Sequence, residues 1–268
     1  MKKIAIAGTD IACSKFIFGT ASLFNAGDER ERAALLAAAA DHGFTHCDTA
    51  PRYGFGMAER DLAPLLRAHP NLTVTTKVGL YPPGGTEQSA RCIFLRKFAG
   101  KLLPPLSRPI KSFDLSRAEQ ALVGSLKRLG RDHIDIYMLH EPERGLVDVD
   151  AWVNWLQGRQ AAGQIRHFGI ALPDAHIAPF LSDESGIAPV IQTIDSLDEK
   201  QADCVIAAGR PLQFTYGYMS AARQRGDARP AREILGDAIR RNATGAILVS
   251  TTKAERVGQY AAIAGDAE

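Results

Sequence analysis

The sequence has little of what marks secreted, membrane-bound or nucleic-acid-binding proteins. Its four cysteines are scattered, so they predict reduced, mostly buried thiols rather than disulfides or a metal site. No apolar run approaches the roughly 20 residues of a membrane span, and the run in residues 1–8 stops at Thr9 and Asp10, too early for a signal peptide. The net charge of +2 decides nothing, but no predicted helix carries a long basic run with aromatics. We therefore expect a cytoplasmic protein without a metal site, with neither nucleic acid nor membrane as a partner.

A glycine-rich dinucleotide loop is missing as well. No G-x-G-x-x-G follows the first predicted strand, which disfavours a doubly wound sheet. Short apolar or β-branched runs instead alternate with longer amphipathic runs, and that alternation indicates βα units with a parallel sheet. The chain of 268 residues, 46% hydrophobic and 23% charged, is long enough for one closed barrel. We predict a single α/β domain, a (β/α)8 TIM barrel over residues 1–268.

Strands and helices are expected in strict alternation. The expected strands are residues 16–18, 44–48, 73–77, 134–139, 167–170, 190–194, 212–216 and 246–249. The expected helices are residues 29–42, 56–68, 116–129, 149–162, 174–181, 199–208, 229–240 and 253–263. Gly43, Gly130 and Gly163 directly follow expected helix ends, as C-terminal caps do. Ser116 and Glu119 have the spacing of a capping box at the start of the third helix.

Two segments fall outside this alternation. Residues 2–14 precede the first barrel strand and predict a β-hairpin, 3–7 with 11–15, that turns at Gly8-Thr9-Asp10. Residues 78–115 form a long loop after the third strand, so they rise from the end of the barrel where active sites lie. Their centre, residues 91–103, has the pattern of a short amphipathic helix. Two interpretations stay open for this loop: a lid over the substrate, or a surface excursion with a solvated basic face.

Reactive side chains follow three consecutive predicted strands. Asp48 ends the second strand, with Tyr53 in the loop beyond it, while Lys77 ends the third strand and His140 the fourth. In a (β/α)8 barrel such strand ends converge on one mouth, where Asp48 can pair with Lys77. Reducing a carbonyl requires a proton for its oxygen. Tyr53 can supply that proton if the Lys77 ammonium lowers its pKa from the value near 10 of a free phenol, and His140 can donate a hydrogen bond to the carbonyl oxygen.

Each of these residues also has an ordinary interpretation. A lone Asp at a strand end usually caps a loop, a lone Tyr in such a loop usually packs, and a lone His is usually structural. A lysine at a strand end is also compatible with a Schiff-base lyase. Only the joint occurrence of Asp48, Tyr53, Lys77 and His140 on consecutive strand ends favours redox chemistry.

The chain resembles the aldo-keto reductase superfamily over nearly its whole length. The resemblance rests on Asp48-Thr49-Ala50-x-x-Tyr53-Gly54 with Glu59, on Thr76-Lys77-Val78-Gly79, and on the stretch 125–140. It implies an NAD(P)(H)-dependent oxidoreductase that interconverts an aldehyde, ketone or sugar with the corresponding alcohol or lactone. Tyr53 would be the general acid/base, Lys77 and Asp48 would tune it, and His140 would orient the substrate. The bacterial branch that is similar to aldose 1-dehydrogenases matches best.

The same resemblance implies a nicotinamide cofactor bound across the barrel mouth. The residues expected to bind it are Gly19, Thr20, Asp48, Gln192, Tyr216, Ser250, Thr251 and Arg256. Gln192 would hold the carboxamide, and Tyr216 would stack on the nicotinamide, with Phe214 as the competing aromatic. A helix N-terminus suits phosphate, and Arg256 in the last helix can pair with a 2′-phosphate. NADP(H) is therefore favoured over NAD(H).

Two positions depart from the family pattern. Ala171-Leu172 stands where members often have Ser-Asn, which hydrogen-bonds the carboxamide, and Ser250 stands where many NADP-dependent members have Lys. Arg256, with Lys253, would then read the 2′-phosphate. The departures keep an alternative open, namely a non-catalytic relative that binds the nicotinamide cofactor and reports redox state to a partner.

Overall fold

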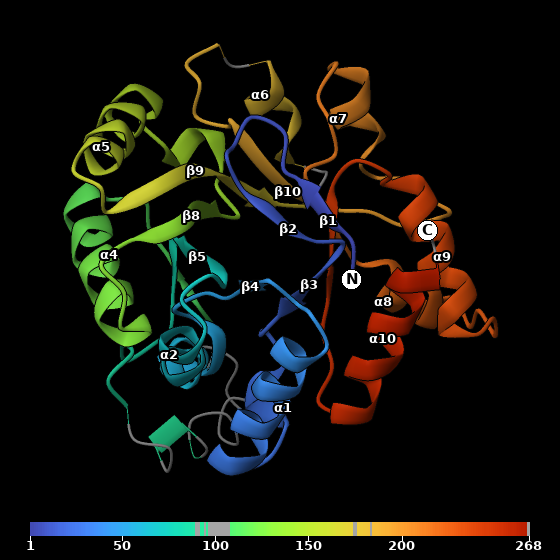
Figure 1. Cartoon of the computed structure of the whole chain (residues 1–268). Coiled ribbons are helices and arrows are strands. Elements are labelled where there is room, and N and C mark those ends of the chain that lie inside the picture. Colours follow the sequence, from blue (N-terminus) through green and yellow to red (C-terminus); the bar gives the residue numbers. More distant parts are fainter. Residues whose placement is uncertain (89–91, 94, 96–107, 174–175, 183, 267–268) are drawn as a thin grey trace.

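The computed structural model describes residues 1–88, 92–93, 95, 108–173, 176–182 and 184–266. Eight parallel strands form a closed barrel in which strands consecutive in the chain lie side by side. They are β3 (Phe16–Gly19), β4 (His46–Asp48), β5 (Thr73–Val78), β8 (Ile134–His140), β9 (Ile165–Leu172), β10 (Val190–Ile194), β11 (Phe214–Tyr216) and β12 (Ala246–Val249). In Figure 1 these strands occupy the centre and the helices surround them. The predicted (β/α)8 barrel is confirmed.

Helices cover the outside of the barrel. They are α1 (Glu29–Asp41), α2 (Met57–Ala68), α4 (Leu115–Leu129), α5 (Val149–Ala161), α6 (Ala178–Leu181), α7 (Asp203–Ala207), α8 (Tyr218–Gln224), α9 (Ala231–Arg241) and α10 (Ala254–Asp266). Their inner faces and the outward faces of the strands bury a continuous apolar layer, which provides most of the stabilisation. Gly43, Gly130 and Gly163 have φ of 83°, 62° and 71° at the ends of α1, α4 and α5, as predicted. The helices α6 and α7 are shorter than predicted, and α8 is an addition, so two helices follow β11.

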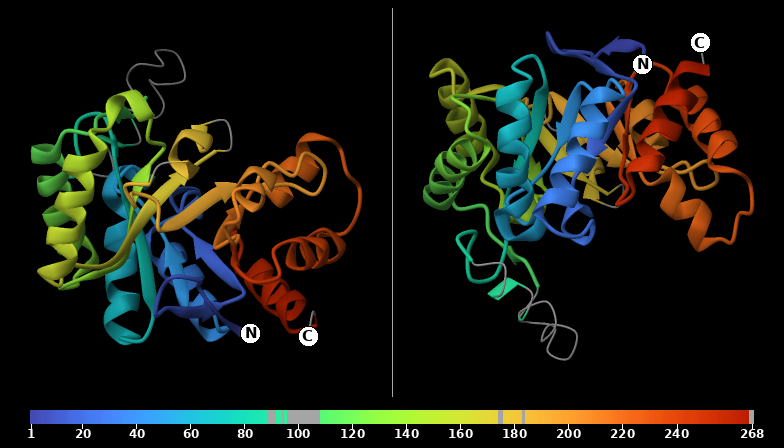
Figure 2. Two further views of the ribbon diagram at one scale, coloured as in Figure 1. Left: turned by 90° about the horizontal axis from the view of Figure 1, so that it is seen from above. Right: turned by 60° about the horizontal axis from the view of Figure 1, so that its bottom comes forward.

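The N-terminal hairpin closes one end of the barrel. Its strands β1 (Lys3–Ala5) and β2 (Ala12–Ser14) pair antiparallel, which confirms the predicted hairpin with shorter strands. Ile6, Ile11 and Cys13 are buried and belong to one cluster with side chains of the barrel interior such as Phe214. Figure 2 shows the hairpin lying across this end. Because β2 leads directly into β3, it is the end at which the strands begin, and the strand-end side chains lie at the opposite end.

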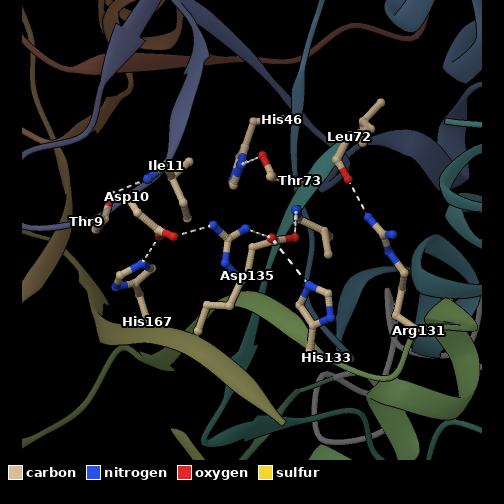
Figure 3. Close-up of polar contacts among 12 residues, drawn as sticks. Thr9, Asp10, Ile11, His46, Leu72, Thr73, Arg131, His133, Asp135 and His167 are labelled. Carbon is tan, nitrogen blue, oxygen red and sulfur yellow. Dashed lines mark hydrogen bonds and ion pairs between the residues drawn. The ribbon is translucent and has the colours of Figure 1, made fainter. Parts of the chain in front are cut away.

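Charged side chains connect the hairpin to the end of the barrel at which the strands begin (Figure 3). In the turn, the carboxylate of Asp10 contacts the ring of His167 at 2.6 Å and accepts from Arg166 at 2.9 Å. These hydrogen bonds lower the pKa of Asp10 to about 2, and the one with His167 has the larger effect. Arg166 also donates to Asp135 at 2.6 Å, and the other Asp135 oxygen accepts the Val74 N–H at 2.8 Å. Asp135 is buried and Asp10 is exposed, so the Asp135 contacts should contribute most of the stability.

Asp135→Ala is expected to destabilise the fold by about 1–3 kcal/mol, because the buried Val74 N–H loses its acceptor. Asp10→Ala is expected to cost less than about 1 kcal/mol, since its ion pairs are solvent-exposed. The free energies of unfolding in urea measure both. Equal losses from the two variants would contradict the anchoring position that we assign to Asp135.

The start of α4 differs from the prediction. Asp114 is the N-cap, and its carboxylate accepts from the Arg117 N–H at 2.9 Å. Ser116 lies inside the helix and donates to the same carboxylate, while Glu119 accepts from the Trp155 indole. The predicted Ser116–Glu119 capping box is therefore wrong, because a better acceptor lies two residues earlier.

The long segment after β5 begins and ends in a paired strand. Its strands β6 (Leu80–Tyr81) and β7 (Ile110–Lys111) pair antiparallel, at the end of the barrel opposite to the hairpin (Figure 2). Gly79 enters this pair with φ 109°, and a Cβ there would lie 2.3 Å from the Phe113 ring, so the turn requires glycine. The predicted helix at 91–103, apart from residues 92, 93 and 95, lies outside the described residues, and so does the choice between a lid and a surface excursion.

Candidate active site

Three strand ends bring an ion pair and an imidazole to the mouth of the barrel. Asp48 ends β4, Lys77 lies next to the end of β5, and His140 ends β8. The Lys77 Nζ atom donates to Asp48 Oδ1 at 2.6 Å and to the Thr49 carbonyl at 3.0 Å. Both partners of the pair are buried. The neighbouring strands thus place these side chains as the sequence predicts.

The backbone after β4 carries Tyr53 back over this pair. The Tyr53 N–H donates to the Ala50 carbonyl at 3.0 Å, and a short 3₁₀ helix, η2 (Tyr53–Gly56), follows. Gly54 has φ 58°, and a Cβ there would lie 3.2 Å from the Met57 Cβ, so glycine fits this turn best. The turn leaves the Tyr53 hydroxyl 3.5 Å from Lys77 Nζ. The Tyr53 and His140 rings meet edge to face, with centroids 5.9 Å apart, so the four predicted catalytic side chains form one cluster.

A second buried ion pair supports the cluster from behind. Glu59 on α2 is fully buried, accepts from the Thr76 hydroxyl at 2.7 Å and pairs with Arg128 of α4 at 2.7 Å. Thr76 directly precedes Lys77, so this pair fixes β5 against α2 and α4. The partner of Glu59 could not be predicted from the sequence, because Arg128 is distant in the chain and no local pattern connects the two residues.

Burial and charge decide the protonation state of Lys77. Burial lowers the pKa of Lys77, but Asp48 and Tyr53 together outweigh burial and hold that pKa above its ordinary value. Lys77 therefore stays an ammonium. A protonated amine is a poor nucleophile, and this argues against the Schiff-base interpretation of Lys77.

The pKa of Tyr53 differs in direction from the prediction. Burial raises the pKa of the phenol above 10, and Lys77 opposes this effect without overcoming it. The expectation that Lys77 lowers the pKa below its ordinary value is therefore wrong for the protein alone. Tyr53 is a phenol at neutral pH, which is the form that can donate a proton. The nearby ammonium would stabilise the phenolate after the donation.

His140 is a neutral imidazole. Burial lowers its pKa well below 6.5, and the charges of Lys77 and Arg52 act in the same direction. Its Nδ1 atom is buried and has no hydrogen-bond partner among the described residues. A neutral ring carries one N–H and one acceptor nitrogen, so His140 retains the capacity to bind a polar group at the mouth.

These two pKa directions predict a flat pH profile for carbonyl reduction. His140 is uncharged and Tyr53 protonated from about pH 6 to about pH 9, so kcat/KM should be constant there and fall only at more alkaline pH. Steady-state rates of aldehyde reduction across this range provide the measurement. An inflection near the ordinary histidine pKa would contradict the assignment of His140 as neutral.

Gln192 and Tyr216 lie at the same mouth. The Gln192 amide Nε2 donates to Asp48 Oδ2 at 3.1 Å, so its Oε1 faces away from the carboxylate, buried and without a partner among the described residues. Tyr216 ends β11 and is half-buried. Phe214 instead stacks on His46 deep in the barrel, with centroids 5.8 Å apart. Of the two competing aromatics, only Tyr216 is placed at the mouth.

The remaining cofactor candidates gather where β3 and β12 end side by side. An added Cβ at Gly19 would lie 3.7 Å from the Ser250 Cβ, while the Thr20 hydroxyl donates to the Asp48 carbonyl at 3.0 Å. The Thr251 hydroxyl accepts from the Lys253 N–H at 3.0 Å, just before α10 begins. Arg256 is exposed in the first turn of α10, so it lies near the free N–H groups of that helix.

The two departures from the family pattern are visible in the structure. Ala171 and Leu172 end β9 with buried side chains that pack in the core. They offer no side-chain hydrogen bond beside Gln192. Ser250 is exposed and carries no charge, which leaves Arg256 and Lys253 as the cations nearest to this loop in sequence.

The described part of the chain has neither a helix suited to a membrane nor a cluster of metal ligands. Over these residues, no helix has the length and apolar character needed to cross a membrane. The same residues contain no group of three or more His, Cys, Asp or Glu side chains arranged to hold a metal ion.

Comparison with known proteins gives this arrangement a family. The model of the Aldo/keto reductase family matches residues 15–195, from β3 through β10. The chain belongs to the aldo/keto reductase family. The match includes the cluster of Asp48, Tyr53, Lys77 and His140 together with Gln192. For this aldo/keto reductase, the cofactor candidates Tyr216, Ser250, Thr251 and Arg256 lie beyond the matched residues.

Curated aldo/keto reductase relatives match parts of the chain. A D-threo-aldose 1-dehydrogenase of a Pseudomonas species is 32% identical over 151 residues, 54% of this chain and 45% of the relative. A pyridoxal 4-dehydrogenase of Microbacterium luteolum is 28% identical over 239 residues, 78% of this chain and 62% of the relative. The chain spans about half the length of the first curated relatives it matches, at 45% and 47%.

Solved structures share the fold over nearly the whole chain. An aldo-keto reductase from Bacillus halodurans, solved in its holo form, has a TM-score of 0.74 and 18% identity, covering 98% of this chain and 90% of its own. An aldo-keto reductase from Klebsiella pneumoniae in complex with NADPH has a TM-score of 0.66 and 22% identity, covering 99% and 90%. At these identities the likeness supports the barrel fold alone.

Proposed function

We propose that this aldo/keto reductase is an oxidoreductase that catalyses NAD(P)(H)-dependent interconversion of an aldehyde, ketone or sugar with the alcohol or lactone. One observation carries the proposal: the Tyr53 hydroxyl lies 3.5 Å from the buried Lys77 ammonium, with the neutral His140 ring against it. In the reducing direction, carbonyl, reduced cofactor and one proton become alcohol and oxidised cofactor. The relatives named for aldose and pyridoxal dehydrogenation support a small carbonyl compound or sugar as substrate.

The residues at the mouth fit a nicotinamide cofactor. The orphaned Oε1 of Gln192 is an acceptor for the carboxamide N–H, and Tyr216 offers an aromatic face beside it. When bound, the reduced nicotinamide would supply the hydride that the carbonyl carbon receives. Ala171 and Leu172 supply no further side-chain partner for the carboxamide, so Gln192 and backbone groups would hold it.

The protein's own groups handle the proton. Tyr53 donates its phenolic proton to the carbonyl oxygen, because burial keeps the phenol protonated at neutral pH. The Lys77 ammonium then stabilises the phenolate, and Asp48 keeps Lys77 charged and directed at Tyr53. His140 donates a hydrogen bond to the same oxygen and orients it. In the oxidising direction the phenolate accepts the proton of the alcohol.

Direct binding of the cofactor tests the proposal. Titrating NADPH and, separately, NADH into the protein should quench tryptophan fluorescence saturably. No saturable binding of either cofactor at millimolar concentration would contradict the proposal. The alternative of a non-catalytic redox sensor, which the Ala171-Leu172 departure motivates, also predicts binding. That alternative is excluded by turnover of any aldehyde or sugar in a panel.

Arg256 should determine a preference for NADP(H). It is exposed at the start of α10, beside free helix N–H groups, where a 2′-phosphate can accept from it. Arg256→Ala is expected to weaken NADPH binding by about tenfold or more and to leave NADH binding within about twofold. Arg232→Ala serves as the control, because it removes a positive charge from α9 and the Arg232 side chain is 73% exposed. Equal weakening of both cofactors by Arg256→Ala would contradict 2′-phosphate recognition.

A further inference from the structure

Arg52 is an arginine at the mouth whose side chain has no hydrogen-bond or ion-pair partner among the described residues. It directly precedes Tyr53, and its guanidinium carbon lies 5.6 Å from the centre of the Tyr53 ring. The residue is half-buried, and its Nε atom is buried without a hydrogen-bond acceptor among the described residues. Buried donors normally have an acceptor, so this atom needs an explanation.

Three other arginines that are buried or half-buried pair with carboxylates. Arg32 pairs with Asp61 at 2.6 Å, Arg128 with Glu59 at 2.7 Å and Arg241 with Asp195 at 3.0 Å. Within the described residues, no carboxylate lies in ion-pair distance of Arg52. The Nε atoms of Arg131 and Arg159 also lack an acceptor among the described residues, but other nitrogens of these two guanidinium groups donate hydrogen bonds. Within the described residues the Arg52 side chain donates no hydrogen bond, so this guanidinium is left open beside the candidate acid.

The charge of the Arg52 guanidinium reaches the candidate proton donor and other groups at the mouth. Its charge acts on Tyr53, on His140 and on Tyr216, and in each case lowers the pKa of that group. These three side chains come from the loop after β4, from β8 and from β11, so the charge of Arg52 acts on strand ends that are separated in sequence.

Other charges at the mouth differ from Arg52 in their environment. Lys77 is neutralised by Asp48, and Lys111 pairs with Glu143 at 2.6 Å. Glu141, directly after His140, has φ 51° and acts on Tyr216, where it raises the pKa. It forms no ion pair with Arg52 in the described part of the chain, so the two opposite charges are not paired with each other.

We propose that Arg52 is a specificity residue that binds an anionic group, a carboxylate or a phosphate, on the carbonyl substrate. The planar fork of a guanidinium matches both groups through paired hydrogen bonds. Because Arg52 lies beside Tyr53, the anionic group is separated from the reacting carbonyl by only a few carbon atoms. The inference rests on the proposed function, since it names the substrate class of the same site.

Matched substrates test the inference. Kinetics with the wild-type protein compare 4-oxobutanoate with neutral pentanal, and glyceraldehyde 3-phosphate with glyceraldehyde. The wild type should have a higher kcat/KM for the anionic substrate than for the neutral one in at least one of these pairs. Arg52→Gln is expected to raise KM for that anionic substrate by about 10- to 100-fold. It should change KM for the neutral substrate of the same pair by less than about threefold. Arg52→Lys should restore part of the loss, because it keeps the charge without the fork.

A matched control uses Arg240→Gln, which removes an arginine whose side chain is 73% exposed on α9 and pairs with Asp237. This variant should leave KM unchanged for both substrates of each pair. Far-ultraviolet circular dichroism and urea unfolding of Arg52→Gln establish that the variant folds.

Each outcome separates the inference from the proposed function. Turnover of the neutral aldehydes, without an Arg52-dependent preference for their anionic partners, overturns the inference and leaves the proposed function in place. If Arg52→Gln loses activity equally on neutral and anionic substrates, Arg52 supports Tyr53 and does not bind the substrate. If the variant binds NADPH more weakly, Arg52 contacts the cofactor. Either result also overturns the inference. Failure of the wild type to turn over any aldehyde, ketone or sugar overturns the proposed function itself.

Discussion

Tyr53→Phe is expected to lower kcat/KM for aldehyde reduction by about 10²- to 10⁴-fold, the usual contribution of a positioned general acid. The variant removes only the hydroxyl that lies 3.5 Å from Lys77. Its ring still meets His140 edge to face, so the shape of the mouth should persist. Binding of NADPH should change little, because no cofactor contact is assigned to the hydroxyl. Steady-state kinetics and a fluorescence titration measure the two quantities separately.

Tyr137→Phe provides the matched control. The Tyr137 hydroxyl is also buried, and it has no hydrogen-bond partner among the described residues. Its ring packs near Trp155, with centroids 6.4 Å apart, in the layer between the barrel and its helices. Loss of this hydroxyl should leave kcat/KM unchanged and stability equal or slightly higher. Tyr53→Phe with activity close to that of Tyr137→Phe would contradict the assignment of Tyr53 as the proton donor.

Lys77→Met should destabilise the protein and abolish reduction. It leaves the buried Asp48 carboxylate with the Gln192 amide as its side-chain partner, and removing one member of a buried pair costs about 3–5 kcal/mol. It also removes the ammonium that stabilises the Tyr53 phenolate. Urea unfolding gives the loss in the free energy of unfolding, and steady-state kinetics give the loss in activity.

The double variant Asp48→Asn/Lys77→Met separates stability from chemistry. It removes both charges, so most of the lost stability should return, since replacing a whole buried pair is often nearly neutral. Activity should stay as low as in Lys77→Met. A stable double variant that regains activity would show that the pair holds the fold only and has no part in the reaction.

The barrel was predictable because its signal is repeated along the chain. Alternating apolar strands and amphipathic helices produce the same pattern for each βα unit, and the strand ends then bring Asp48, Lys77 and His140 together without further information. The N-terminal hairpin was predictable from its turn residues. The helix α8 was not expected, because it is short, lies between Gly217 and Gly226, and breaks the rule of one helix after each strand.

Features that depend on contacts between distant residues could not be predicted from the sequence. The choice of Asp114 over Ser116 as the N-cap depends on where the chain enters α4, and Trp152 fixes that entry by donating to the Phe113 carbonyl at 2.9 Å. The sign of the Tyr53 pKa shift depends on how deeply the mouth buries the phenol. A sequence pattern identifies Lys77 as a neighbour but not the degree of burial, which proves to be the larger effect.

Transfer of label from the cofactor to the substrate tests the central claim most directly. NADPH deuterated at both C4 positions is incubated with the protein and an aldehyde that it turns over, or with the whole aldehyde panel, and the alcohol is analysed by mass spectrometry. The proposed function predicts one deuterium on the carbinol carbon, formed by the wild type and at least about 10²-fold more slowly by Tyr53→Phe. Saturable NADPH binding without deuterium in any alcohol would contradict catalysis and favour a cofactor-binding relative that performs no reduction.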